Sequence, residues 1–418
     1  MDRPEAIGAL FTLTALYYYL NHRWLRLPVT IGVMVIALGL SALIHQLASH
    51  GFGIEERIFE DWLREINFNK TVLHGMLGVL LFSGALQLDL HKLLAHKWSI
   101  GLLATVGVLA STLFIGTLMW WGLHWLGIDI SYAYCLVFGA LISPTDAIVV
   151  MGALKKAHVP KPLEMAITGE ALFNDGAAIV LFSLLLGLAT GTDELRPGAL
   201  AIPFLRESVG GILLGLGYAY VVSWMLKMAD DKQLGILVTL AVATGGYALA
   251  DALQFSGPIA IAVSGLMLGY RKGQGAISPD TSTAMETFWQ LMDHVYNAVL
   301  FAMLGMEFML LQFTSESLIA GLAAICLVLV GRFLSVGIPA LMIGPFRALG
   351  KVSVAILTWG GLRGSVSVAL ALSIPRSQER DIILAMTYIV VIFSIVAQGL
   401  TMEKMVERSM RNDASRAP

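Results

Sequence analysis

The chain has 418 residues, of which 57% are hydrophobic and 13% charged, and its formal net charge is −2. This charged fraction is about half that of an average soluble domain, and the balance of charge provides no basic surface for nucleic acid. The composition therefore excludes a soluble globular domain and a nucleic-acid-binding protein, and it indicates a protein embedded in membrane lipid.

Thirteen apolar segments, called spans 1 to 13 below, follow one another along the chain. They run over residues 6–21, 28–47, 71–88, 98–121, 131–154, 166–190, 206–227, 233–251, 257–270, 287–310, 317–341, 351–374 and 381–402. Most are about 20 residues long, which is the length of a helix that crosses a bilayer. None shows the alternation of a strand, and only helices or closed barrels satisfy their backbone groups in lipid. The sequence thus predicts an all-α membrane protein with about 13 transmembrane helices.

Lys and Arg are unequally divided between the connections that join these spans. With the N-terminus outside, the inside connections and the C-terminal tail hold about twice as many of them as the outside segments do. Because basic residues concentrate on the cytoplasmic side of a membrane, we expect a multi-pass protein whose N-terminus is outside and whose C-terminus is in the cytoplasm.

Two six-helix repeats are expected, spans 1–6 and spans 8–13, with span 7 as their link. Because the link contains an odd number of spans, the two repeats have inverted topologies, and span 5 corresponds to span 12. Both are interrupted at mid-depth, span 5 by the sequence SPTD at Ser143–Asp146 and span 12 by GGLRG at Gly360–Gly364. Paired broken helices in matching positions, which we expect to cross, indicate a substrate site at the membrane midplane.

Few spans have an ionisable residue in their interior, where a charge costs at least about 2.5–3.5 kcal/mol. Span 5 holds Asp146, span 6 holds Glu170 and Asp175, span 11 holds Arg332 and span 12 holds Arg363. Span 10 holds Asp293, His294 and Glu307 nearer its ends. Asp146 and Asp175 coincide with a helix break and with polar neighbours, so we expect them to be functional. For Glu170 and the two arginines, structural pairing within the bundle is an equally good interpretation.

The polar groups around the break in span 5 have the chemistry of an alkali-cation site. Pro144 frees a main-chain carbonyl, and the Thr145 hydroxyl and the carboxylates of Asp146 and Asp175 add further hard oxygen ligands. A carboxylate that binds either a proton or a cation, never both, is the minimal chemistry of an antiporter. Proton-coupled symport stays open on this reasoning.

Two other classes fit the sequence less well. A cation channel would need a carbonyl-lined filter or a symmetric ring of acids. An intramembrane enzyme would need a nucleophile with its base, or a metal motif such as H-E-x-x-H. The sequence shows neither pattern.

These motifs resemble those of the NhaP-type bacterial sodium/proton antiporters, in the cation/proton antiporter superfamily. The matching sequences are SPTD in span 5, GEALFNDG at Gly169–Gly176 in span 6, Gly331–Arg332 in span 11 and GGLRG in span 12. Weaker matches are Arg26–Pro28, Ser264–Gly269, and Leu300 to Glu307. The resemblance covers nearly the whole membrane part, and GEALFNDG is its most specific element.

This resemblance implies a homodimer in the bacterial inner (cell) membrane that takes part in pH homeostasis. A core domain would comprise spans 4–6 (98–190) and spans 11–13 (311–403). The interface domain would comprise spans 1–3 (1–97) and spans 7–10 (191–310), followed by a short cytoplasmic tail (404–418). No cofactor is implied, and the small ligands would be the transported sodium, lithium or potassium ions and protons.

The resemblance also assigns roles to individual residues. Asp175 would carry the proton and the cation in turn, and Asp146, Thr145 and Asn174 would complete its site. Glu170 and Arg332 would form a structural ion pair, and Arg363 would compensate the helix ends at the crossing. The neighbour of Asp175 is an amide, Asn174, which cannot release a proton, so an electroneutral exchange of one cation for one proton is expected.

Two positions depart from the family pattern. Ala171 and Ser83 stand where many relatives have Ser and Glu, so two oxygens that could ligate an ion are absent. Potassium/proton antiport is therefore an alternative to sodium/proton antiport.

Overall fold

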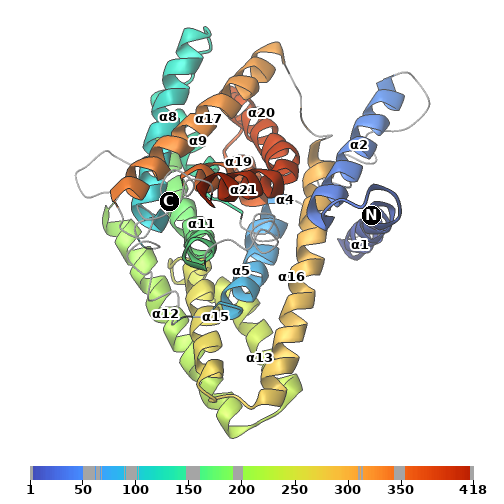
Figure 1. Ribbon diagram of the computed structural model, residues 1–418, viewed down its shortest axis with the longest axis vertical. Helices are drawn as coiled ribbons and strands as arrows, with labels where there is room; N and C mark the ends of the chain where they lie inside the picture. The colour runs from blue at the N-terminus through green and yellow to red at the C-terminus, as the bar shows by residue number, and fades with distance from the viewer. Residues whose placement is uncertain are drawn as a thin grey trace.

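The computed structural model describes residues 3–49, 68–88, 103–146, 161–191, 201–308, 314–342 and 354–414, together with residues 62, 66, 90, 101 and 311. Every regular element within these ranges is a helix (Figure 1). The predicted all-α class is thereby confirmed. The proposed domain limits at residues 97 and 310 lie outside the described residues, as do many of the basic residues counted for the orientation.

The helices are, in chain order, α1 (Arg3–Leu20), α2 (Val29–Ser49), α4 (Phe68–Lys70), α5 (Leu77–Leu86), α8 (Val108–Trp125), α9 (Tyr132–Ile142), α11 (Lys161–Ala189), α12 (Ala201–Met228), α13 (Lys232–Ala241), α14 (Tyr247–Ala252), α15 (Gly257–Gly273), α16 (Pro279–Glu307), α17 (Ser315–Met342), α19 (Ser365–Ser373), α20 (Gln378–Phe393) and α21 (Gly399–Ala414). Short π-helical stretches extend several of them: η1 (Asn21–Leu25), η2 (Thr71–Met76), η3 (Leu103–Gly107), η4 (Val242–Gly246) and η6 (Ser394–Gln398). Residues 354–359 are also helical. Each of the thirteen predicted spans therefore contains helix.

Seven helices within the described residues are long and apolar enough to cross a membrane. They are Val29–Ala48, Thr105–Trp125, Ile167–Ala189, Ile202–Met228, Lys232–Ala252, Ser315–Gly337 and Gln378–Ser409. They coincide with predicted spans 2, 4, 6, 7, 8, 11 and 13. The chain is thus a multi-pass membrane protein, and thirteen crossings remain a prediction.

Polar side chains at the N-termini fix where several helices begin. Ser131, Asp231, Ser256, Ser278 and Ser377 each accept a hydrogen bond from the backbone N–H three residues later, at the starts of α9, α13, α15, α16 and α20. Such caps satisfy one of the four N–H groups that the first turn of a helix leaves free. Proline is the second residue of α15 and the first of α16, within the first turn where its missing N–H removes no helical hydrogen bond.

Small residues allow helices to approach closely where α15 lies against α5. A methyl group on Gly265 would lie 2.8 Å from the carbonyl oxygen of Phe82, and one on Gly269 would lie 2.6 Å from that of Leu86. In lipid, helix association depends on such van der Waals contact because no hydrophobic force drives apolar helices together. The predicted Ser264–Gly269 motif therefore serves helix packing.

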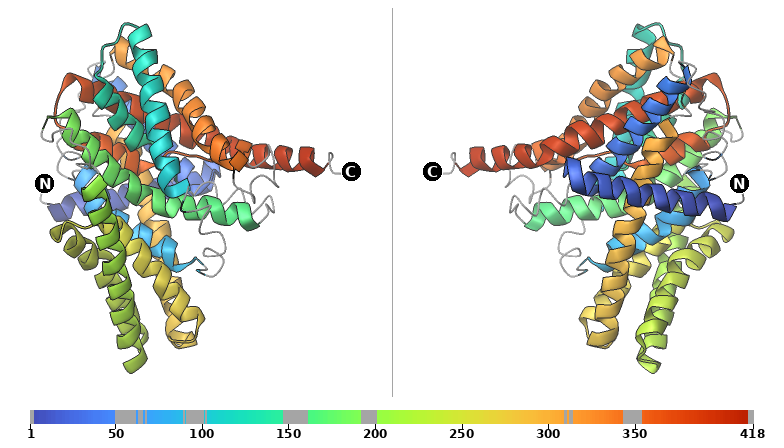
Figure 2. Two further views of the ribbon diagram at one scale, coloured as in Figure 1. Left: turned by 90° about the vertical axis from the view of Figure 1, so that its left-hand side faces the viewer. Right: turned by 90° about the vertical axis from the view of Figure 1, so that its right-hand side faces the viewer.

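Within the described residues, the buried apolar side chains form two clusters. One contains side chains of α5, α12, η4, α14, α15 and the N-terminal half of α16, all from the predicted interface spans. The larger one joins α8, α9, α11, α17, α19 and α20 to α1, α2 and the C-terminal half of α16. Figures 1 and 2 show α12, α13 and α15 at one end of the molecule and α8, α9 and α17 at the other. Helix α16 runs from the first cluster to the second.

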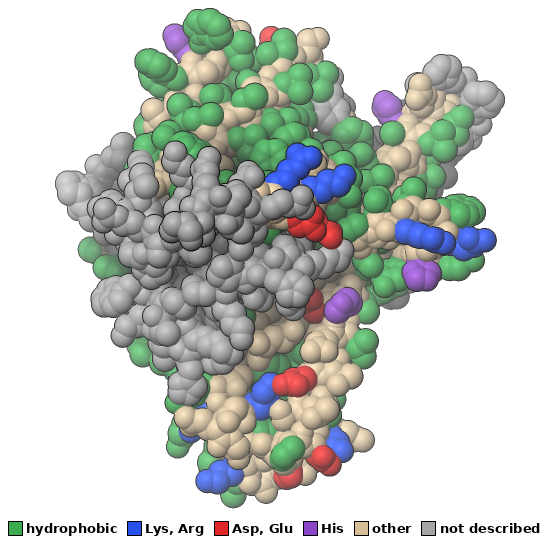
Figure 3. All heavy atoms as spheres, in the orientation of Figure 1, with side chains coloured by type: hydrophobic (Ala, Val, Ile, Leu, Met, Phe, Trp, Pro, Cys, Tyr) green, Lys and Arg blue, Asp and Glu red, His purple; other side chains and the backbone are tan. Residues whose placement is uncertain are grey.

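One group of charged side chains lies at the lower end of the molecule in Figure 3, where the connections of α12 to α13 and of α15 to α16 lie, and others lie near its middle and right-hand side. Lys232 Nζ lies 3.2 Å from Asp280 Oδ2, and Lys272 forms an ion pair with Glu286. The long helices between the two ends expose apolar side chains instead, as on α12. This distribution suits helices surrounded by lipid with charged connections in water.

Candidate functional site

The two interrupted spans cross and are joined by a backbone hydrogen bond. After α9 ends at Ile142, residues 143–146 are not helical, and neither are residues 361–364 before α19 begins. The N–H of Asp146 donates to the carbonyl oxygen of Leu362 at 2.7 Å. The two predicted breaks therefore lie against each other, as crossing broken helices require, and the part of span 5 beyond Asp146 lies outside the described residues.

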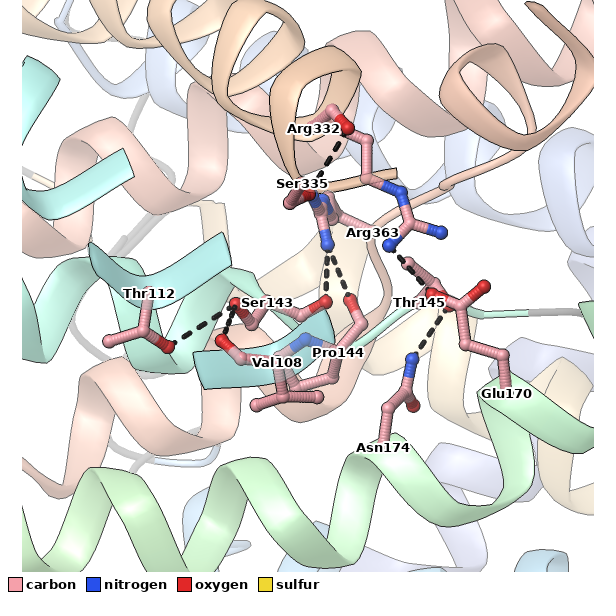
Figure 4. A network of polar contacts seen from close by, with 10 residues as sticks. All are labelled: Val108, Thr112, Ser143, Pro144, Thr145, Glu170, Asn174, Arg332, Ser335 and Arg363. Atoms are coloured by element: carbon pink, nitrogen blue, oxygen red, sulfur yellow. Dashed lines mark hydrogen bonds and ion pairs between the residues drawn. The ribbon is translucent and has the colours of Figure 1, made fainter. Parts of the chain in front are cut away.

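Arg363 lies at this crossing, where the end of α9 leaves carbonyl oxygens without helical partners. Its Nη1 donates to the carbonyl oxygens of Ser143 at 2.6 Å and of Pro144 at 3.1 Å (Figure 4). Its backbone N–H donates to Ser394 Oγ at 2.8 Å, in the π-helical stretch η6. The guanidinium therefore places a buried positive charge against the negative end of α9, which a helix dipole favours.

Glu170 on α11 and Arg332 on α17 form an ion pair, with 2.6 Å between Oε1 and Nη1, and both side chains are buried (Figure 4). Gly361 provides the space beside it, because a methyl group there would lie 2.7 Å from Arg332 Nε. The two opposite charges predicted from the sequence thus lie together. Their structural role in the folded protein remains a prediction.

Asn174 connects α11 to the first broken segment. Its Nδ2 donates to Thr145 Oγ1 at 2.8 Å, and both side chains are buried (Figure 4). Its Oδ1 has no hydrogen-bond partner in the described structure. Glu170 and Asn174 are one helical turn apart, so one face of α11 holds both the ion pair and the contact to the break.

A cavity of about 160 Å³ lies between the broken segments, α5, α11, α16 and α19. Its polar lining comprises Thr145, Asp146, Thr168, Asp175, Asp293, Asn297, Ser365 and Ser367. The two acids predicted to bind the cation and the proton, Asp146 and Asp175, both line this cavity. Gly364 keeps the cavity wall clear at Asp146, since a methyl group there would lie 3.0 Å from Asp146 Oδ2.

The two positions that depart from the family pattern have different surroundings. Ala171 lines the cavity, so a hydroxyl is missing where an ion could contact it. Ser83 is fully buried and does not line the cavity; its hydroxyl donates to the carbonyl oxygen of Trp289 at 2.8 Å. Only the Ala171 position thus bears directly on the cavity.

Two further residues of α16 line the cavity: Asp293, to which the sequence analysis gave no role, and Asn297, which it did not name. Asp293 looked close to the end of span 10, but α16 begins at Pro279 and places it near the middle of a 29-residue helix. The available signal was the pair of polar residues at i and i+4, which lie on one face of an apolar helix.

Comparison with known proteins places these observations in a family. The pattern of the family described as sodium/hydrogen exchanger, transmembrane, matches residues 10–408. The Na(+)/H(+) antiporter NhaP of Pseudomonas aeruginosa is 44% identical over 408 residues, which are 97% of this chain and 96% of that protein. The Na(+)/H(+) antiporter NhaH of Halobacillus dabanensis is 35% identical over 84% of this chain and 87% of its own length.

A solved structure agrees at the level of the fold. The sodium proton antiporter MjNhaP1 from Methanocaldococcus jannaschii superposes with a TM-score of 0.75, with 20% sequence identity and coverage of 97% of this chain and 99% of that one. The family match spans both broken segments and the cavity between them. On this evidence, the chain belongs to the sodium/hydrogen exchanger family.

Proposed function

We propose that this protein is a monovalent cation/proton antiporter that exchanges one sodium ion for one proton. The observation that carries the proposal is the cavity at the crossing of the two broken segments, because the carboxylates of Asp146 and Asp175 both line it. The family membership and the antiporter activity named for its relatives support the same conclusion.

In the proposed mechanism, Asp175 alternates between a protonated and a cation-bound state. Asp146 is held by the backbone hydrogen bond of its N–H to Leu362, and Thr145 is held by Asn174. These fixed groups would supply further oxygen ligands without rearrangement, which favours binding of a hard cation. Alternating access would then expose the loaded site to each side of the membrane in turn.

Potassium or lithium is an alternative cargo. Ala171 lines the cavity without the hydroxyl that many relatives have, so this chain offers a cation fewer side-chain oxygens. Potassium, which is larger than sodium and more easily dehydrated, would lose less from this difference, and this reasoning favours potassium over lithium.

The remaining features of the family plan complete the proposal. The protein would form a homodimer in the bacterial inner membrane, with its N-terminus outside and its C-terminus in the cytoplasm. Residues 98–190 and 311–403 would form the core domain, which carries the ion, and residues 1–97 and 191–310 the interface domain. Residues 404–418 would lie in the cytoplasm, where α21 continues as helix to Ala414. The role of the protein would be pH homeostasis, and it would need no cofactor.

The test is fluorescence dequenching in acid-loaded proteoliposomes, with sodium, lithium and potassium added in turn. Wild-type protein should dissipate the pH gradient with sodium, and Asp175→Asn should not. Asp129→Asn is the matched control, because the Asp129 side chain is 93% exposed and lies near His124, away from the cavity. Dequenching by Asp175→Asn at the wild-type rate would disprove the assignment of the carrier, and a wild type inert to all three cations would disprove the function.

A further inference from the structure

The part of the cavity lining that α16 provides holds two polar residues. Asp293 and Asn297, together called the α16 station below, lie one helical turn apart and both line the cavity. This helix belongs to the predicted interface domain, whereas Asp146 and Asp175 belong to the predicted core. The station and the carrier therefore line one cavity from helices of the two predicted domains.

Asn297 is a buried amide with one hydrogen-bonding atom free to bind a ligand. Its side chain is 3% exposed, and its Nδ2 donates to the main-chain carbonyl of Asp293 at 2.8 Å. Its Oδ1 has no hydrogen-bond partner in the described structure. Buried polar atoms are paired in the great majority of cases, so an acceptor left free at the wall of a cavity points to a cation or its water.

The charges around the cavity favour the same occupant. Asp146, Asp175 and Asp293 place three carboxylates on it, and no Lys or Arg is among the described residues that line it. Clefts lined by one sign of charge concentrate the opposite ion. The cavity volume of about 160 Å³ is more than ten times the roughly 10–15 Å³ that one water needs, so it has room for a cation with part of its hydration shell.

We propose that Asp293 and Asn297 form a second binding station for the transported monovalent cation, which receives it partly hydrated before it passes to Asp175. The Asp293 carboxylate supplies the charge and Asn297 Oδ1 a neutral oxygen ligand. The Leu77 and Leu81 side chains of α5 line the same cavity and keep the surroundings apolar, which strengthens the attraction. This inference rests on the proposed antiport and adds a residue pair that sets affinity.

The test compares the sodium concentration that gives half-maximal dequenching in proteoliposomes. Asp293→Asn and Asn297→Ala should raise this KM about tenfold, equivalent to about 1.4 kcal/mol, with the rate at saturating sodium retained. Asn297→Asp, which adds a carboxylate, should lower it. Asp293→Glu should restore part of the wild-type KM. The control is Asp280→Asn, an acid on the surface end of the same helix, which pairs with Lys232.

A second readout does not depend on exchange. Thermal stabilisation of the detergent-purified protein by sodium, with choline as the balancing cation, should have its midpoint shifted in the same directions by the same variants. If the wild type binds sodium but exchanges nothing, the proposed function fails while this readout still tests the station. Unchanged KM and midpoint in Asp293→Asn and Asn297→Ala would overturn the station, as would a loss of maximal rate at unchanged KM.

Discussion

Arg332 Nη1 lies 2.6 Å from Glu170 Oε1, which links α17 in the second half of the chain to α11 in the first. The pair lies one helical turn from Asn174 and beside Gly361, next to both broken segments. It places a positive charge against a buried acid that does not line the cavity. The two acids of α11 thus have separate surroundings, one paired with a base and one facing the cavity.

Glu170→Gln should therefore act on stability more than Asp175→Asn does. Removing one partner of a buried ion pair costs about 3–5 kcal/mol because the other charge stays buried without compensation. We expect a lower melting temperature in detergent for Glu170→Gln than for Asp175→Asn, measured on purified protein. The reverse order would contradict the structural role of the pair, and the double variant Glu170→Gln/Arg332→Gln should recover part of the loss.

Arg363 should tolerate lysine better than glutamine. Arg363→Gln removes the charge and leaves the carbonyl oxygens of Ser143 and Pro144 short of a donor, which costs about 1–3 kcal/mol for each buried group. Arg363→Lys keeps a positive charge near the end of α9, although it loses the planar fork. Melting temperature and exchange rate should fall in the order wild type, Lys, Gln. Equal loss in both variants would show that the charge at this helix end is unimportant.

Exchange should be electroneutral. Asn174 cannot release a proton, and its Nδ2 is engaged by Thr145 Oγ1, so Asp175 alone would alternate between its two loaded states. The test imposes a membrane potential on proteoliposomes that have equal pH and equal cation on both sides, with an ionophore for an ion that the protein does not carry. An electrogenic cycle would gain about 2.3 kcal/mol per charge per 100 mV. Sustained proton movement under this potential would refute the prediction and implicate Asp146 as a second carrier.

We expect the ionised Asp230 carboxylate to stabilise the folded protein near neutral pH and to lose this effect in acid. Hydrogen bonds from Ser278 and Thr281 lower the pKa of this exposed carboxyl, which joins the α12–α13 connection to the start of α16. A lowered folded-state pKa contributes stability above the unfolded-state value of 3.8, and this contribution is lost as pH falls through the folded-state value.

Asp230→Asn should therefore reduce the melting temperature at pH 7, and the difference from wild type should shrink as pH falls below about 4. Thr281→Val, which removes one donor and keeps the shape of the side chain, should give a smaller effect of the same kind. A difference that is constant from pH 7 to pH 3 would exclude this ionic contribution.

Sequence patterns predicted the helical class and the crossing because their causes are local. Apolar length specifies a membrane helix, and Ser143–Asp146 and Gly360–Gly364 break two spans where paired breaks are informative. The role of Asp293 could not be predicted, because its exposure to the cavity depends on how α16 packs across both hydrophobic clusters. Likewise, the sequence alone suggested that Ser83 stands where an ion ligand has been lost. In the structure Ser83 donates a hydrogen bond to the carbonyl oxygen of Trp289 and does not line the cavity.

The hydrogen bond from Arg363 to Ser143 also has a consequence for biosynthesis. The two residues are 220 positions apart in the chain. Because ribosomes add about 5–20 residues per second, Arg363 is synthesised on the order of tens of seconds after Ser143. During that interval the carbonyl oxygens at the end of α9 lack the donor that the mature protein supplies. A nascent chain halted before residue 363 should therefore hold an unfinished site, and chaperones or insertion factors would have to shield it until the last spans arrive.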